Sequence, residues 1–227
     1  MVFHNQVLLG LIGALLFGGG LPKRQPEPIH TSHTMFFGID PSTCEVIEFD
    51  EETPGQGLLS EIISEGTPVA ITAQHRLPGG QYEQANVASL FDTSIPSARS
   101  TDFTTPNPQA MRSMGKVLTL GSSQPSQSGQ SRTGGKLEVD FSAMSSITLK
   151  AVHVLDIRKE DAGSKLELIN KKGEIFRTFE LPITNTYGAI RLNTGDVKGV
   201  AKLRVVFGDE KQQRGGGAID VIEFCRD

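Results

Sequence analysis

Two stretches near the ends of the folded region decide the fold: Cys44-Glu-Val-Ile-Glu-Phe-Asp50 and Ala218-Ile-Asp-Val-Ile-Glu-Phe-Cys225. Each holds one of the two cysteines of the chain. When the stretches are laid antiparallel with Cys44 opposite Cys225, the cysteines face each other at roughly 4.5–5.5 Å between Cα atoms, which is within disulfide range. The sequence therefore predicts a disulfide that joins the first strand of a domain to its last. Two free, buried thiols are the alternative.

The same alignment fixes the register of the two strands. Ile47 falls opposite Ile222, and Phe49 falls opposite Asp220. Such a pairing defines a fold class and a domain boundary. Because disulfides persist in oxidising environments, a disulfide between these strands also indicates an oxidising compartment, such as the outside of the cell. It does not identify a ligand or a partner.

Length and charge limit the classes of protein that fit the chain. Its 227 residues suffice for one domain of about 180 residues with an N-terminal extension. Lys and Arg total 22 against 26 Asp and Glu, a net charge of -4. This balance argues against a nucleic-acid binder, because such proteins carry a basic face. With two Tyr and no Trp, the chain offers few aromatic platforms.

The N-terminus carries a short apolar run. Residues 7–17 are all apolar or glycine, which matches the length of a signal-peptide core and is too short to span a bilayer. No Lys or Arg precedes the run, and the basic pair Lys23-Arg24 follows it. A signal anchor and a buried helix are therefore alternatives. We interpret residues 1–20 as a secretion leader, and we expect a secreted or cell-surface protein with no integral membrane span.

Two further segments complete the predicted domain organisation. Residues 21–43 are rich in Pro, Ser, Thr and His, as in a flexible arm or linker. Residues 44–227 contain many short segments, several with alternating polar and apolar residues, and few amphipathic helices. We therefore predict an all-β domain there, a jelly-roll-like β-sandwich of mostly antiparallel strands with its first and last strands adjacent.

The second half of the chain holds most of the predicted strands. Residues 165–169 and 174–181 are expected to form a hairpin, since Gly173 supplies the positive φ that the turn requires. One short helix is predicted at residues 58–63. The remaining predicted strands are residues 69–73, 88–91, 116–120, 136–141, 146–156, 189–193 and 200–207.

Several short motifs also follow one another in a recognisable order. They are Glu48–Asp50, Ala88–Pro96, Asp102–Pro106, Gly135–Ser142, Val154–Ile157, Leu166–Gly173 and Gly216–Phe224. Their order resembles the jelly-roll β-sandwich domain of secreted bacterial surface proteins sorted by exosortase, the PEP-CTERM proteins. This resemblance covers roughly residues 45–225 and implies an extracellular, non-catalytic module without a particular ligand. The chain departs from the pattern because no C-terminal sorting tail follows Cys225.

Carboxylates are the candidate ligands of a metal. If the apolar residues of the last strand face the core, alternation places Asp220 on the core side too, where an unpaired carboxylate is costly. Asp50 lies at the adjacent corner, and Asp92 and Asp102 lie in or beside a Pro-rich loop. Because calcium takes about 6–8 oxygen ligands from several segments, we predict a structural Ca²⁺ held by Asp220, Asp50, Asp92 and Asp102. In the alternative, these residues cap turns and accept backbone N–H bonds.

These observations favour a non-catalytic extracellular module with a structural or adhesive role at the cell surface or in a matrix. It would self-assemble by adding the arm of residues 21–43 to the sheet of a neighbour. A carbohydrate-binding module is the second hypothesis, with Gln84, Asn86, Arg99 and loop acids contacting a surface glycan, although two tyrosines provide little stacking area. A hydrolase is the third, because folding can bring two carboxylates together without a sequence motif. The chain contains no nucleophile elbow, zinc-protease motif or phosphate loop.

Overall fold

The computed structural model describes residues 44–50, 57–93, 115–120, 133–184, 188–209 and 214–227. All of these belong to the second of two compact units, Ile39–Asp227. The leader of residues 1–20 and the arm of residues 21–43 lie outside the described residues. The predicted domain boundaries therefore stay predictions.

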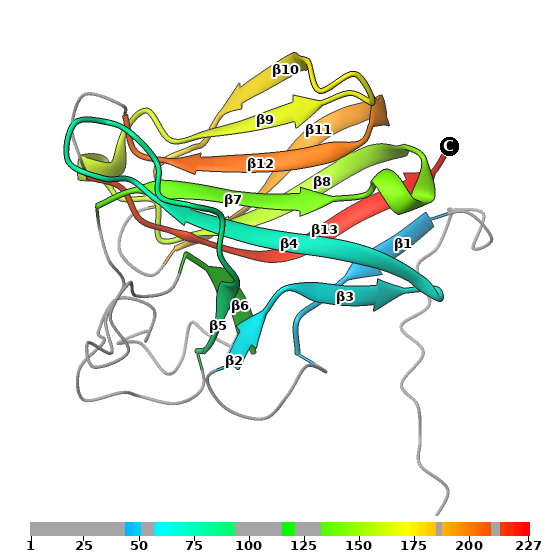
Figure 1. Ribbon diagram of the computed structural model, residues 1–227, viewed down its shortest axis with the longest axis horizontal. Coiled ribbons are helices and arrows are strands. Elements are labelled where there is room, and N and C mark those ends of the chain that lie inside the picture. The colour runs from blue at the N-terminus through cyan, green and yellow to red at the C-terminus, as the bar shows by residue number, and fades with distance from the viewer. Residues whose placement is uncertain (1–43, 51–56, 94–114, 121–132, 185–187, 210–213) are drawn as a thin grey trace, which may run out of the picture. The chain divides into compact units, whose positions relative to one another are not determined.

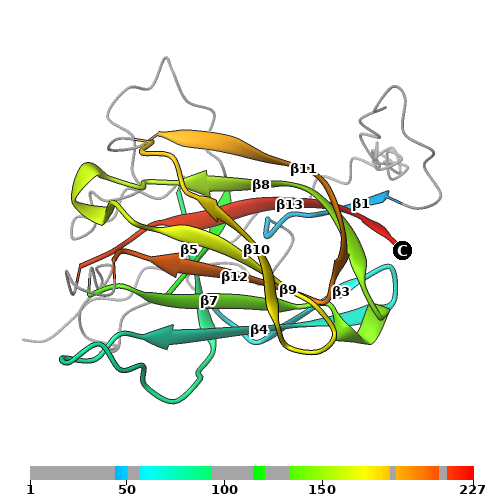
Figure 2. The same cartoon turned by 90° about the horizontal axis from the view of Figure 1, so that it is seen from above.

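The described residues form two sheets that pack face to face as a β-sandwich (Figure 1; Figure 2). The first, sheet A, comprises β1 (Cys44–Ile47), β2 (Gly57–Leu59), β5 (Ala88–Asp92), β6 (Lys116–Thr119), β8 (Ile147–Leu155), β11 (Ala189–Val200) and β13 (Ala218–Arg226). Its order is β11-β8-β13-β6-β5-β2, and β1 pairs with β13 on the side that β6 also uses. The predicted all-β fold is confirmed.

Sheet B consists of β3 (Glu61–Ser64), β4 (Thr67–His75), β7 (Gly135–Asp140), β9 (Lys165–Ile169), β10 (Ile175–Glu180) and β12 (Lys202–Phe207). Its order is β10-β9-β12-β7-β4-β3, and every neighbouring pair is antiparallel. Strands β9 and β10 form the predicted hairpin, and Gly173 in their turn has a φ of +80°. Between β7 and β13 the chain crosses repeatedly from one sheet to the other, as in a jelly roll.

The first and last described strands lie side by side. In the antiparallel pair of β1 and β13, Cys44 is opposite Cys225 and Ile47 is opposite Ile222, as the sequence predicted. The two cysteines form a disulfide. The prediction that Phe49 lies opposite Asp220 is wrong, because β1 ends at Ile47. Phe49 is nevertheless completely buried.

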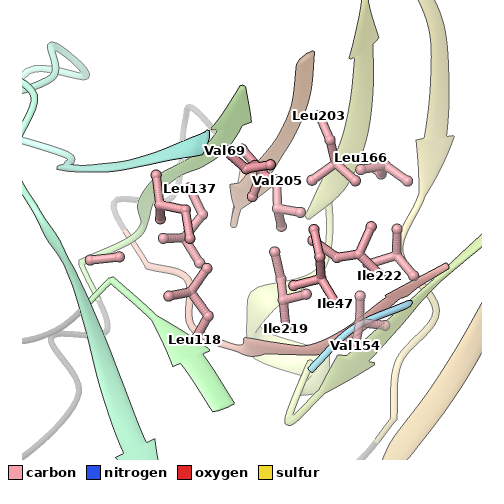
Figure 3. Close-up of a cluster of buried hydrophobic side chains, with 14 of the residues drawn as sticks. Ile47, Val69, Leu118, Leu137, Val154, Leu166, Leu203, Val205, Ile219 and Ile222 are labelled. Atoms are coloured by element: carbon pink, nitrogen blue, oxygen red, sulfur yellow. The ribbon is translucent and has the colours of Figure 1, made fainter. Parts of the chain in front are cut away.

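One continuous apolar core fills the space between the two sheets. Figure 3 shows side chains from both sheets meeting there, among them Ile47, Ile219 and Ile222 of sheet A and Val69 and Val205 of sheet B. The side chains of β1 and β13 are therefore part of the central core. The disulfide joins strands that are also held by this packing.

Helical structure in the described residues is limited to two 3₁₀ turns, η1 (Ser142–Met144) and η2 (Lys159–Asp161). Within those residues no helix is long and apolar enough to cross a membrane. The predicted helix at residues 58–63 is wrong, because this segment forms β2 and β3. The chain passes from the edge of sheet A to the edge of sheet B there. Leu59 and Ile62 enter the core, whereas Leu58 and Ile63 stay exposed.

Candidate functional site

The neighbour of β13 changes in the middle of the strand. On the side opposite β8, Ile219 pairs with Leu118 of β6, whereas Ile222 pairs with Ile47 of β1. Asp220 therefore lies where one neighbouring strand has ended and the next begins.

A β-bulge occupies the same position on the other side of β13. Along β8, Ile219 pairs with Val154 and Ile222 pairs with Val152, so two residues of β13 oppose one residue of β8. A bulge of this kind redirects side chains and interrupts the regular alternation of a strand. Asp220 is one of the two bulged residues, and it retains only 8% of its full exposure. The sequence predicted a buried carboxyl here, but from a regular alternation that the bulge breaks.

Asp220 is a buried acid with acidic neighbours. Within the described part of the chain, no group donates a hydrogen bond to its carboxyl. Burial, followed by the negative charges of Asp50 and Glu48, raises the pKa of Asp220 from 3.8 to about 7. This carboxyl can consequently gain or lose a proton near neutral pH. Glu48 was not among the predicted site residues. Its position two residues before Asp50 was the available signal.

Asp50 holds the start of β6. Its Oδ1 accepts a hydrogen bond from the backbone N–H of Lys116 at 2.7 Å. Gly115, which precedes that residue, has a φ of +69°, and a Cβ added there would overlap the Asp50 carboxylate. A glycine at this position allows the close approach. The turn-capping alternative from the sequence therefore describes one role of Asp50.

Asp92 reaches the same place from another strand. In the ladder of β5 and β6, Asp92 is opposite Lys116, the residue whose N–H bonds to Asp50. Asp50 and Asp92 thus both lie at the start of β6, and Asp220 follows the β13 residue that pairs with Leu118 of β6. Asp102 lies outside the described residues. No three Asp, Glu, His or Cys side chains in the described ranges form a group that could hold a metal ion. The calcium site stays a prediction.

The opposite end of β13 carries a different polar cluster, which we call the clasp: Glu45, Ser64, Thr67 and Arg226. Arg226 donates to the backbone oxygen of Ser64 at 3.0 Å and to Oγ1 of Thr67 at 3.2 Å, and its Nε pairs with Glu45. The hydroxyl of Ser64 also donates to Glu45. The clasp therefore joins β1 and β13 of sheet A to the β3–β4 hairpin of sheet B, next to the disulfide.

Tyr82, the one of the two tyrosines that the structure describes, is already engaged. Nζ of Lys136 lies 3.6 Å from the ring centroid of Tyr82, and the guanidinium of Arg76 lies 5.6 Å from it. Gln84 and Asn86 are exposed, whereas Arg99 lies outside the described residues. Since cations occupy the ring of Tyr82, this arrangement provides no free stacking platform at Tyr82.

Acidic residues on the outer face of sheet B are neutralised across the strands. Glu138 accepts from Lys202 at 3.1 Å and from Arg204 at 2.9 Å. Asp140 lies 2.8 Å from Lys202, and Glu167 lies 3.4 Å from Arg204. For Asp140, burial opposes ionisation, but hydrogen bonds from Lys202 and Ser142 outweigh it and lower the pKa below 3.8, which does not suit a general acid. The candidate functional site is therefore Asp220 with its acidic neighbours Asp50 and Glu48, which we call the Asp220 corner.

Comparisons with known proteins identify no family. No family model matches the chain, and no curated protein matches it. Among solved structures, a DUF4465 family protein from Bacteroides caccae ATCC 43185 is similar with a TM-score of 0.41 and 13% identity, over 81% of this chain and 100% of that one. The enzymatically active domain of tailspike protein 4 from bacteriophage CBA120 is similar with a TM-score of 0.28 and 11% identity, over 81% of this chain and 19% of that one.

Proposed function

We propose that this protein is a non-catalytic extracellular module with a structural or adhesive role at the cell surface or in a matrix. The observation that supports it most is the Cys44–Cys225 disulfide between the first and last strands of the sandwich. Disulfides persist in oxidising compartments, and a link between the ends of a domain protects it where no chaperone acts. The apolar run of residues 7–17 supports export independently.

Self-assembly is the second part of the proposal. A sandwich has open sheet edges, and an added strand gives affinity through main-chain hydrogen bonds. The arm of residues 21–43 is the predicted donor strand. The resemblance to the jelly-roll domain of exosortase-sorted surface proteins supports the same location and role.

Export and assembly are tested with the full chain expressed in a bacterial host that exports proteins. We expect an extracellular product that lacks the leader, carries the disulfide and forms oligomers in sedimentation analysis. A full-length product that stays in the cytosol with both thiols free would contradict the proposed location. An exported protein that stays monomeric at every concentration would contradict self-assembly alone.

We further propose that the Asp220 corner binds calcium outside the cell, where calcium is plentiful. The support is a buried carboxyl with Asp50 and Glu48 beside it, since a divalent cation would offset their mutual repulsion. Calcium also accepts backbone oxygens, so the described acids need not complete the coordination. Thermal unfolding at about pH 8, where Asp220 is ionised, should show a higher Tm in Ca²⁺ than in EDTA. Asp220→Asn is expected to remove that difference, and equal Tm values for the wild type would exclude the site.

A hydrolase is the second candidate, favoured by one observation. Asp220 can hold a proton near neutral pH beside the carboxylate of Asp50, and glycoside hydrolases pair a protonated carboxyl with an ionised one. Release of reducing ends from a panel of polysaccharides by the wild type, but not by Asp220→Asn, would favour this function. Equal release by both proteins would exclude the Asp220 corner as an active site.

A further inference from the structure

Sheet B ends in two edge strands. Among the described strands, β10 pairs only with β9, and β3 pairs only with β4. Because ladder hydrogen bonds alternate, every second residue of an edge strand directs its N–H and C=O away from the sheet. The bonds from Leu181 to Ser164 and from Ile71 to Ser60 place Thr178 of β10 and Ile63 of β3 among these residues. Both edges therefore offer backbone groups to a further strand.

Both edges also expose large apolar side chains. Ile63 on β3 is 63% exposed, and Ile175 and Phe176 on β10 are 49% and 42% exposed. Soluble proteins usually protect an open edge strand with charges, bulges or a covering segment. β10 has a bulge between Ile175 and Arg177, but residues 177–180 pair regularly with β9. This regular segment has the same four-residue length as β3.

The directions of the strands allow the two edges to meet. Sheet B has six strands, and every neighbouring pair is antiparallel, so β10 and β3 run in opposite directions. Figure 1 shows this arrangement, with the β9–β10 turn and the β3–β4 turn at the same end of the sheet. A second copy in the same orientation would therefore bring its β3 antiparallel to β10 of the first. Sheet B would continue without a change of pattern.

Charges at the two turns are complementary. The β9–β10 turn presents Lys171 and Lys172, which are both exposed. The β3 edge presents Glu61 on the strand and Glu65 in the turn, and these are exposed as well. Side-by-side copies in one orientation place Lys171 and Lys172 of one near Glu65 of the next, while Glu61 lies at the other end of β3 and Glu174 remains in the basic turn. Opposite charges at a rim favour association and fix the register.

From these observations we infer that copies of this protein associate head to tail, with β10 of one copy adding to β3 of the next. The occupant of each edge is thus the opposite edge of a second copy. Such a heterologous contact does not close on itself, so it produces an open chain rather than a dimer. The inference rests on the proposed self-assembly, but it assigns the contact to the two edges of sheet B in place of the arm of residues 21–43.

The test uses three lysine substitutions, each in the full chain expressed and exported as above. Ile63→Lys alters the β3 edge, Phe176→Lys alters the β10 edge, and Leu58→Lys is a matched control on β2, where Leu58 is 75% exposed. All three sites are exposed, so we expect each variant to keep its fold, checked by its melting curve. Sedimentation should show chains for the wild type and for the control, and monomers for each edge variant alone.

Mixing the two edge variants gives the decisive result. Each retains the edge that the other lacks, so we expect a 1:1 dimer and nothing larger. Dimers of Ile63→Lys alone would instead indicate a twofold β10–β10 contact and overturn the inference. Chains that persist in both edge variants, but are lost when residues 21–43 are deleted, would keep the proposed assembly and overturn the edge pairing. A wild type that is monomeric throughout would contradict both.

Discussion

The two halves of β13 are held in different ways. The half from Ile222 to Arg226 pairs with β1 and β8, carries the disulfide and ends in the clasp. The half from Ala218 to Val221 contains a bulge and the buried carboxyl of Asp220, and its neighbours are β8 and the short strand β6. The half from Ile222 to Arg226 is held by a disulfide, and the charge of Arg226 is paired with Glu45. The half from Ala218 to Val221 contains Asp220, whose ionised form is disfavoured by burial.

This difference suggests that one half of β13 serves the stability of the fold and the other half serves binding or a response to pH. Residues that serve stability are expected to have satisfied partners, as Arg226 has. Buried ionisable groups without partners are costly, and they occur more often where a protein binds or responds to something. The clasp and the disulfide therefore explain how the sandwich stays closed. The Asp220 corner is where a ligand or a change of pH would act.

The largest expected effect comes from removing the disulfide. It links residues that are 181 positions apart, and the chain-entropy model gives about 5 kcal/mol as an upper value for so long a loop. We expect the double variant Cys44→Ala/Cys225→Ala to lose about 3–5 kcal/mol of unfolding free energy in urea titrations. Wild-type protein in reductant should match the variant. A loss below about 1 kcal/mol would show that packing alone holds the two strands together.

The next effect is the pH dependence set by Asp220. The pKa of Asp220 is about 7 in the folded state, against an ordinary value of 3.8. Below pH 3.8 the carboxyl is protonated in both the folded and the unfolded state, so its burial does not reduce the free energy of unfolding. As the pH rises from that value through the folded pKa, the free energy of unfolding falls. Asp220→Asn should therefore stabilise the protein by roughly 2–4 kcal/mol at about pH 8 and change little at about pH 4. Urea titrations at both pH values measure this, and an equal effect at both would contradict the assignment.

Loss of the clasp should change the free energy of unfolding less than loss of the disulfide or substitution of Asp220. Arg226→Ala removes hydrogen bonds to a charged group and to backbone, and we expect a loss of about 1–2 kcal/mol near neutral pH. Burial opposes ionisation of Glu45, but hydrogen bonds from Arg226 and Ser64 outweigh it and lower the pKa of Glu45 below 4.5. Stability from this pair is therefore present above that value and lost as the pH falls through the lower folded pKa. A loss that stays constant into strong acid would rule out the ion pair as its cause.

The smallest effect should come from an arginine on the exposed face of sheet A. Arg191 makes two short hydrogen bonds to Glu223 of β13, at 2.7 and 2.6 Å, yet its side chain is 45% exposed. Because solvent and salt screen such a pair, Arg191→Ala should cost less than about 0.5 kcal/mol. The comparison with Arg226→Ala under identical conditions is informative. Equal losses of unfolding free energy would mean that an ion pair between the sheets stabilises the protein no more than one on the exposed face of sheet A.

The register of the first and last strands could be predicted because both stretches read as strands and each carries one cysteine. Two independent signals, periodicity and disulfide geometry, then agree on one alignment. The hairpin around Gly173 was predictable for a similar reason, since the turn residue and the flanking alternation coincide. Where local signals agree, the sequence alone was sufficient.

The errors have equally local causes. The alignment could not be extended from Ile47 to Phe49, because β1 ends at Ile47 and β13 takes β6 as its neighbour beyond that point. Residues 58–63 contain four apolar residues in six, a spacing that suits a helix turn as well as two short strands. Tertiary packing decided between them, because Leu59 and Ile62 enter the core from different sheets. Glu48 was missed although it lies two residues before Asp50, because the sequence does not show that folding brings its charge near Asp220.

The comparison between the halves of β13 is tested most directly by native-state hydrogen exchange along that strand. After correction for intrinsic rates, we expect residues 222–226 to keep the same protection between about pH 5 and about pH 9. Residues 218–221 should lose protection as the pH rises through the pKa of Asp220, and Asp220→Asn should abolish that loss. Equal protection of both halves across this range would contradict the account.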